Sequence, residues 1–259
     1  MIPRPVKRAI RKLVAPPAAP HPPAQPVDAA VVTTALQPGI ESDTVEVQAL
    51  RGLIDSGFPH IVVDVGAHDG RRGSNSWPFV KEGWNAVLVE PHPSTYGRLA
   101  TNLAGYPNAR LVQGAIGAEP GEFPLFEGLD GDLTTSTLST DENKWMDLVR
   151  GESTVMVQVE TLTSLLDRHD IPTDFSFLLV DAEGMDYDVL LGLRPASHRP
   201  RIIVTEEYLF NVEKHNAKYR LLLDNGYAFF RTVDCNNSVW VANEWVETCR
   251  HNEAAYNSR

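Results

Sequence analysis

The sequence predicts an α/β protein with a doubly wound, mostly parallel seven-stranded sheet that finishes in an antiparallel C-terminal strand pair. Three observations support this prediction. Short apolar runs rich in β-branched residues alternate with segments of helical periodicity between residues 42 and 226. The first run, 61–65, leads into a loop with glycines at positions 66 and 70. Four apolar runs end in acidic residues, at the edge where parallel sheets bind ligands.

The expected strands are 61–65, 86–90, 111–116, 155–159, 175–180, 201–205, 227–233 and 239–242. The alternating pattern of 155–159 predicts a strand near an edge or outside the main sheet. Helices are expected near 43–56, 71–85, 96–103, 162–166, 185–193 and 219–223. Asp43 and Glu46 have the spacing of a capping box, which would begin the first helix. Phe123 and Phe126 are expected in a short hairpin.

Length and composition indicate one globular unit preceded by an extended segment. The chain has 259 residues, of which 42% are hydrophobic, enough for one sizeable core. Residues 1–41 hold nine of the 19 prolines and begin with several basic residues. We expect a flexible tail there, and favour a solvated tail over a short helix that contacts an acidic membrane surface or a partner. Residues 42–259 are expected to form a single domain.

Charge and cysteine content argue against several classes of protein. The net charge of −11 disfavours a dedicated nucleic-acid binder, which would show a basic surface. No apolar run reaches the roughly 18 residues of a membrane span, and Lys12 and Pro16 interrupt any signal-like start. Cys235 and Cys249 lack the spacing of a metal site or a disulfide framework. This favours reduced thiols and a cytoplasmic location.

Four acids are expected at one edge of the main sheet. Asp64, Glu90, Asp181 and Glu206 stand at the carboxyl ends of the strands near 61–65, 86–90, 175–180 and 201–205. The carboxyl ends of parallel strands meet at the same edge, so these side chains should lie close together. Core packing does not account for such a group, and we therefore expect a ligand there.

The loop after the first strand reads Gly66-Ala67-His68-Asp69-Gly70. A dinucleotide-binding loop needs G-x-G-x-x-G, in which the middle glycine lets a pyrophosphate approach the backbone. Because His68 takes that position and Asp69 adds negative charge, a nicotinamide or flavin dinucleotide is disfavoured. The phosphate-binding pattern G-x-x-x-x-G-K-[ST] is absent from the sequence.

A cofactor without phosphate fits this loop better. Asp64 and the glycine loop could hold a cationic ammonium group. Glu90 could accept hydrogen bonds from two ribose hydroxyls. S-adenosylmethionine has these parts, which makes it the cofactor that the spacing of acid, loop and acid favours.

The chain resembles the FkbM-type methyltransferases, class I enzymes that use S-adenosylmethionine. The resemblance covers roughly residues 45–243. It rests on 63–70, Ser74-Asn75, Gly83-Trp84, 89–93, 179–187 with Leu190 and Gly192, 204–207 and 222–227. The segment Asp181-Ala182-Glu183-Gly184 is its most specific part. His68 and His92 stand where the family often has asparagine, which affects only the fine contacts of those loops.

The resemblance implies a set of cofactor-binding residues and a class of acceptor. The cofactor site would consist of Asp64, Gly66, Ala67, His68, Gly70, Ser74, Asn75, Glu90, Pro91, Ala115 and Asp181. The implied reaction is methyl transfer to an oxygen, commonly a hydroxyl of a sugar or of a glycosylated product. The partner would then be a small hydroxylated acceptor. A homo-oligomer is left open.

Removal of the acceptor's proton needs a base or a metal ion, because an alcohol is a poor nucleophile near neutral pH. Asp181, Glu206 and Glu207 are the candidates, since they end adjacent strands and three carboxylates suit Mg²⁺ or a similar hard cation. Some sugar methyltransferases of similar fold use a metal together with a histidine base. Gly184 stands where that histidine would be.

A base role therefore falls on Asp186, on His215, or on one of the carboxylates Asp181 and Glu206, and the sequence does not choose among them. Glu183 and Asp186 could equally cap the helix that follows them. His215 lies in a charged helix start, where a solvated residue is the commoner case.

Two other functions are alternatives to the methyltransferase. A non-catalytic binding protein would keep the fold and bind the cofactor without methyl transfer. A nicotinamide-dependent oxidoreductase is disfavoured by His68. The segment 128–140 is expected either to lie over the cleft as a lid or to be a plain surface loop.

Overall fold

The structure is a computed structural model that describes residues 43–131, 133–141, 144–233 and 236–258. The expected N-terminal tail, 1–41, and Cys235 lie outside the described residues. None of the described helices is long and apolar enough to cross a membrane.

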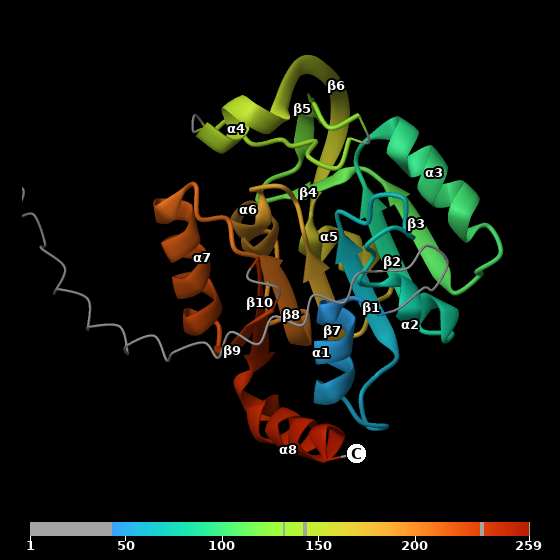
Figure 1. Cartoon of the computed structure of the whole chain (residues 1–259), viewed down its shortest axis with the longest axis vertical. Helices are drawn as coiled ribbons and strands as arrows, with labels where there is room; N and C mark the ends of the chain where they lie inside the picture. Colours follow the sequence, from blue (N-terminus) through green and yellow to red (C-terminus); the bar gives the residue numbers. More distant parts are fainter. Residues whose placement is uncertain (1–42, 132, 142–143, 234–235, 259) are drawn as a thin grey trace, which may run out of the picture. The chain divides into compact units, whose positions relative to one another are not determined.

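A seven-stranded sheet forms the centre of residues 43–258 (Figure 1). Its strands run in the order β3 (Ala109–Gln113), β2 (Asn85–Glu90), β1 (Ile61–Val65), β7 (Asp174–Val180), β8 (Arg199–Glu206), β10 (Asn237–Ala242) and β9 (Tyr227–Val233). Only β10 runs opposite to the other six strands. The predicted doubly wound sheet with an antiparallel C-terminal pair is confirmed.

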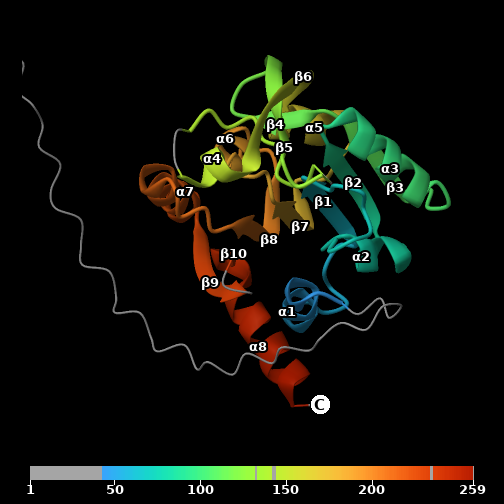
Figure 2. The ribbon, with the colours of Figure 1, turned by 45° about the horizontal axis from the view of Figure 1, so that its top comes forward.

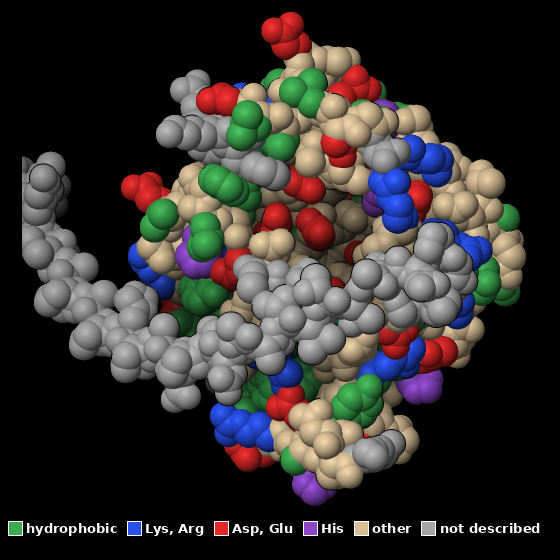
Figure 3. All heavy atoms as spheres, viewed as in Figure 1, with side chains coloured by type: hydrophobic (Ala, Val, Ile, Leu, Met, Phe, Trp, Pro, Cys, Tyr) green, Lys and Arg blue, Asp and Glu red, His purple; other side chains and the backbone are tan. Residues whose placement is uncertain are grey.

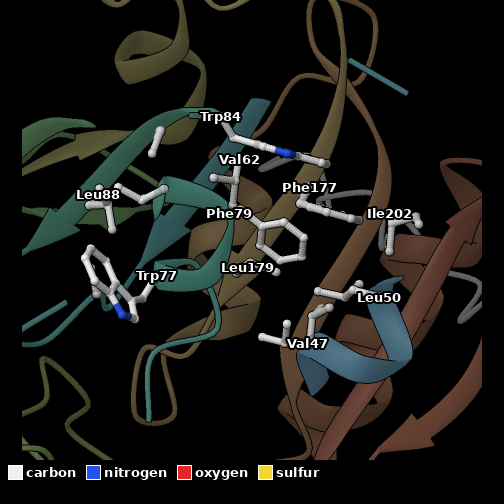
Figure 4. Close-up of a cluster of buried hydrophobic side chains, with 14 of the residues drawn as sticks. Val47, Leu50, Val62, Trp77, Phe79, Trp84, Leu88, Phe177, Leu179 and Ile202 are labelled. Atoms are coloured by element: carbon white, nitrogen blue, oxygen red, sulfur yellow. The ribbon is translucent and has the colours of Figure 1, made fainter. Parts of the chain in front are cut away.

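Helices pack on both faces of this sheet, because its central strands are apolar on both sides. One face buries side chains of α1 (Val45–Leu53), α2 (Trp77–Lys81), α3 (Pro93–Leu103) and α8 (Val246–Asn257). The other buries side chains of α5 (Leu162–Arg168), α6 (Asp186–Leu191) and α7 (Val212–Asp224). On the first face Trp84 stacks on Phe177 with ring centroids 5.3 Å apart, and Phe79 packs against both (Figure 4).

A second sheet of three strands adjoins the main one, in the order β4 (Ala115–Gly117), β6 (Arg150–Thr161) and β5 (Gly121–Gly128) (Figures 1 and 2). The expected strand 111–116 is two strands. β3 ends at Gln113, the nitrogen of Gly114 donates to the carbonyl oxygen of Glu90 over 3.1 Å, and the chain then enters β4. The pattern at 155–159 was interpreted correctly, since this segment lies in β6, outside the main sheet.

Two local expectations are corrected, and two C-terminal elements are added. Phe123 and Phe126 both lie in β5, which pairs with β6 across the long connection 129–149 that holds α4 (Lys144–Val149), so they form no short hairpin. Thr44, not Asp43, caps α1, since its hydroxyl accepts from the nitrogen of Val47 over 3.1 Å. Asp43 instead pairs with Arg51. The C-terminal elements η1 (Asn243–Trp245) and α8 were not expected from the sequence.

Candidate functional site

Two adjoining cavities open at the carboxyl edge of the main sheet. One encloses about 580 Å³ and the other about 660 Å³, each including some space open to solvent. We call the first the Glu90 cavity and the second the Asp64 cavity, after the acid that distinguishes each. Gly66, His68, Thr134, Asp181 and Glu183 line both, and we call these five residues the junction. Figure 3 shows acidic side chains gathered in a hollow on this face of the molecule.

The glycine loop is held against the ends of two neighbouring strands. The nitrogens of Gly66 and Ala67 both donate to the carbonyl oxygen of Val89 over 3.0 Å. Gly66 has a φ of +94°, and a Cβ added there would lie 1.9 Å from the carbonyl oxygen of Asp181. Only glycine allows β1 and β7 to end so close together. Gly70 lines neither cavity, and a Cβ there would lie 2.5 Å from Leu99, so its role is to let the loop pack on α3.

Glu90 ends β2 and is buried, with both carboxylate oxygens facing the loops beside it. One oxygen accepts from the nitrogen of His68 over 3.0 Å, and the other from the nitrogen of His92 over 2.9 Å. Burial raises the pKa of Glu90 to about 7, against the effect of these two bonds. Each carboxylate oxygen keeps a second lone pair, so Glu90 can still accept hydrogen bonds from a ligand in the cavity.

The remaining walls of the Glu90 cavity are mostly apolar. They include Val65, Val89, Pro91, Ala115, Ile116, Leu125 and Leu138. Leu133, Thr134 and Ser136 also line it, so part of the segment after β5 lies on this cavity. The hydroxyl of Thr137 donates to the carbonyl oxygen of Glu183 over 2.7 Å and thereby ties this segment to the turn after β7.

Asp64 is buried in β1 at the second cavity. The hydroxyl of Ser76 donates to its carboxylate over 2.5 Å, and burial raises the pKa of Asp64 to about 6. Ala67, Ser74 and Asn75 line the same cavity. Asn75 is fixed by the hydroxyl of Thr44, which donates to its side-chain oxygen over 2.7 Å. The Asp64 cavity is therefore a polar space with a buried carboxyl group in its wall.

Two of the junction residues are acids, Asp181 and Glu183. Asp181 is exposed to the cavity, but protein atoms surround it closely enough that lost hydration, followed by repulsion from Asp186 and Asp64, raises its pKa to about 7. Glu183 is half-buried, and burial together with repulsion from Asp181 and Glu206 raises its pKa to about 9. An arrangement of this kind favours a cationic ligand or a group that gives up a proton.

Asp186 and Glu206 lie beside the junction without lining either cavity. Asp186 is buried, and it accepts hydrogen bonds from the hydroxyl of Thr205 over 2.7 Å and from the nitrogen of Glu206 over 2.8 Å. These bonds join α6 to the end of β8. Burial, followed by repulsion from Asp181, raises the pKa of Glu206 to about 8, and its Oε2 atom is buried without a hydrogen bond in the described part of the chain.

Glu207 faces α7 rather than the cavities. Its carboxylate accepts from the hydroxyl of Tyr219 over 3.1 Å, lies 3.2 Å from Nδ1 of His215, and lies 3.8 Å from the buried ammonium group of Lys218. Burial lowers the pKa of His215. The described residues hold no group of three His, Cys, Asp or Glu side chains that could bind a metal ion, so Asp181, Glu206 and Glu207 do not form the expected set.

Sequence reasoning missed part of this site. Glu183 was interpreted as a helix cap as readily as a functional residue, yet it lines both cavities. Leu125 and Leu138 were also missed, because they come from β5 and the segment after it, outside the main sheet. The signal for Glu183 was its place beside Asp181 in the most specific segment of the resemblance.

Comparisons with solved structures find weak similarities. For each structure we give the sequence identity, the TM-score, and the fractions of this chain and of the other chain that the alignment covers. A precorrin-6y C5,15-methyltransferase from Geobacter metallireducens GS-15 has 12% identity, a TM-score of 0.42 and shares of 78% and 96%. A putative caffeoyl-CoA O-methyltransferase from Staphylococcus aureus has 11% identity and a TM-score of 0.46, and the alignment covers 78% of this chain and 84% of that chain. Fibrillarin from Aeropyrum pernix, in complex with natively bound S-adenosyl-L-methionine, has 12% identity and a TM-score of 0.38. The alignment covers 76% of this chain and 72% of that chain. No curated protein matches the sequence.

The family comparison is more specific. The profile of the methyltransferase FkbM domain matches residues 64–229, from the buried acid of β1 to the middle of β9. The match therefore includes the glycine loop, Glu90, the turn after β7 and the end of β8. The chain belongs to the methyltransferase FkbM domain family.

Proposed function

We propose that this protein is an S-adenosylmethionine-dependent O-methyltransferase that acts on a hydroxyl of a sugar, a glycoside or a related small molecule. The observation that supports it best is the meeting of the two cavities at Asp181, with Glu90 in the wall of one and Asp64 in the wall of the other. Membership of a methyltransferase family supports the same reaction class.

The residues of the two cavities fit the cofactor. Glu90 has free lone pairs for the two ribose hydroxyls, and the apolar walls around Ala115 and Leu125 suit the adenine ring. Asp64, Ser74 and the edge of the glycine loop suit the amino-acid end in the polar cavity. When bound, the cofactor supplies a methyl group on a positively charged sulfur.

We assign to Asp181 the role of the base that accepts the proton of the acceptor hydroxyl. Its carboxylate is exposed at the junction, and a pKa of about 7 lets the group ionise and accept a proton near neutral pH. Among the other candidates, Asp186 is bonded to Thr205 and the backbone, and His215 lies beside Glu207 on α7. Glu206 lines neither cavity. No step is assigned to Mg²⁺, because Glu207 contacts Tyr219 and Lys218 of α7 and lines neither cavity.

The test uses the full chain with S-adenosylmethionine and a panel of monosaccharides, glycosides and amines. Formation of S-adenosylhomocysteine and the mass of the methylated product are followed together. We expect transfer to a hydroxylated compound, and we expect Asp181→Asn to lower the rate about 100-fold or more. Binding of S-adenosylhomocysteine to that variant, measured by calorimetry, should remain within a few fold.

Three outcomes would contradict the proposal in different ways. A chain that binds neither the cofactor nor its demethylated product is no methyltransferase of this kind. A chain that binds both without transfer to any compound would be a binding protein. Transfer to the amines alone would overturn the hydroxyl acceptor.

A further inference from the structure

Glu183 lies at the point where the two cavities meet. Its backbone has a φ of +49°, which is uncommon for a residue other than glycine, and Gly184 follows with a φ of +88°. Two consecutive residues of this conformation reverse the chain directly after Asp181. As a result Asp181 and Glu183 both line the two cavities, although only one residue separates them.

The turn that presents Glu183 is fixed on three sides. Its carbonyl oxygen accepts the hydroxyl of Thr137 over 2.7 Å. A Cβ at Gly184 would lie 3.2 to 3.3 Å from Tyr208 and Met146, so these side chains pack directly on the turn. The nitrogen of Met185 donates to the carbonyl oxygen of Ala182 over 3.1 Å. The position of Glu183 is therefore set by packing and does not depend on its own carboxylate.

The carboxylate of Glu183 has no hydrogen bond or ion pair within the described part of the chain. The charged groups that affect it most strongly, Asp181 and Glu206, are acids that repel it. A cation at the junction would offset this repulsion and lower the pKa of Glu183 from about 9, so that the carboxyl group ionises when a cationic ligand is bound. In S-adenosylmethionine the positive sulfur lies between the adenosine part and the amino-acid part, and so belongs where the Glu90 cavity meets the Asp64 cavity.

We propose, on the basis of the proposed function, that Glu183 contacts the sulfonium end of the cofactor and makes the protein bind the charged methyl donor in preference to its neutral demethylated product. The donor and the product differ there by one methyl group and one positive charge. Contacts of the adenosine and amino-acid parts with Glu90 and Asp64 are common to both molecules. A preference between them must therefore come from the junction.

Calorimetry tests the proposed preference for the methyl donor and needs no methyl acceptor. Dissociation constants are measured at one pH for S-adenosylmethionine, for S-adenosylhomocysteine, and for sinefungin, in which a protonated amine replaces the methylated sulfur. We expect Glu183→Gln to weaken the two cationic ligands about tenfold, as expected for one lost charge contact. The affinity for S-adenosylhomocysteine should stay within about twofold.

Glu206→Gln is the matched control, since it removes one ionisable group from the same set of acids but lies outside both cavities. It should weaken the cationic ligands less than Glu183→Gln does. Glu183→Asn, which suits a positive φ, repeats the test if the glutamine variant melts at a lower temperature than the wild type.

Equal weakening of all three ligands, or no change in any of them, would overturn the role of Glu183. An effect of Glu206→Gln as large as that of Glu183→Gln would also overturn it, in favour of a diffuse field of the whole acidic group. A wild-type chain that binds none of the three ligands would contradict the proposed function itself.

Discussion

The hydroxyl of Thr137 donates a 2.7 Å hydrogen bond to the carbonyl oxygen of Glu183 and so joins the segment after β5 to the turn after β7. Thr137 is buried, and its oxygen also accepts from the nitrogen of Ser139 over 2.9 Å. Thr137→Val keeps the shape but leaves both backbone groups without this partner. We expect a loss of about 1–3 kcal/mol in the free energy of unfolding, measured with urea, and faster amide exchange over 129–140.

Thr101→Val is the control for this change. The hydroxyl of Thr101 donates to the carbonyl oxygen of Gly97 within α3, at an exposed position. It should therefore shift the free energy of unfolding by no more than about 0.5 kcal/mol. If both valine variants unfold alike, the bond between Thr137 and Glu183 does not hold the segment in place.

Gly66 and Gly73 form a matched pair for the close approach of β1 and β7. Both have a positive φ, of +94° and +66°, but an added Cβ meets the carbonyl oxygen of Asp181 at 1.9 Å in one case and nothing within 4 Å in the other. Gly73→Ala should cost about 1–2 kcal/mol, the backbone strain alone. Gly66→Ala should cost more and abolish cofactor binding, because β7 must move away. Urea titration and calorimetry measure the two effects, and equal costs would contradict the close approach.

The main sheet and its row of acids could be predicted from the sequence because both follow from short-range patterns. A continuous apolar run such as 61–65 has few alternatives to a buried strand, and an acid at its end lies at the ligand edge of a parallel sheet. Asp64 and Glu90 line cavities there. The split at Gly114 was not predicted, although Gln113 and Gly114 interrupt the apolar residues of 111–116, whose second half joins another sheet.

The metal set shows the limit of reasoning from sequence position alone. Glu206 ends β8 and Glu207 follows it directly, and neighbours in extended chain point to opposite sides. Glu207 accordingly meets Tyr219 and Lys218 on α7. This alternation argues against both glutamates binding the same metal ion. Glu183, by contrast, lies at the junction in a turn with two residues of positive φ, and the sequence indicated it only through its place in the segment 181–184.

Glu90→Gln tests how the ribose end is held. Both carboxylate oxygens accept backbone N–H groups, from His68 and from His92, and a glutamine can accept only one of them because its amide nitrogen is a donor. We expect S-adenosylhomocysteine to bind about tenfold more weakly or worse, as measured by calorimetry. Glu122→Gln, at an exposed position of β5, should leave the affinity unchanged. Retention of full affinity by Glu90→Gln would remove Glu90 from the cofactor site.

Mg²⁺ should not stabilise the protein through the acids of the site. Glu207 is paired with Lys218 and Tyr219, so Asp181 and Glu206 alone would have to bind the ion. We expect the melting temperature and the affinity for S-adenosylhomocysteine to be the same with Mg²⁺ and with a chelator. A rise in both with Mg²⁺ that Glu207→Gln abolishes would show that Glu207 turns toward the cavity after all.

The buried carboxyl group of Asp64 should make the stability of the cofactor-free protein depend on pH. Burial raises its pKa to about 6, above the value of about 3.9 in an unfolded chain. Between these values the folded state holds more protons than the unfolded state, so the free energy of unfolding falls as pH rises and levels off above about pH 6. Asp64→Asn does not titrate, and its amide oxygen can still accept the hydroxyl of Ser76. The difference in the free energy of unfolding, wild type minus Asp64→Asn, is measured by urea titrations. It should fall by on the order of 2 kcal/mol as pH rises from 4 to 8. A difference that stays flat or rises with pH would mean that Asp64 is hydrated in the folded chain.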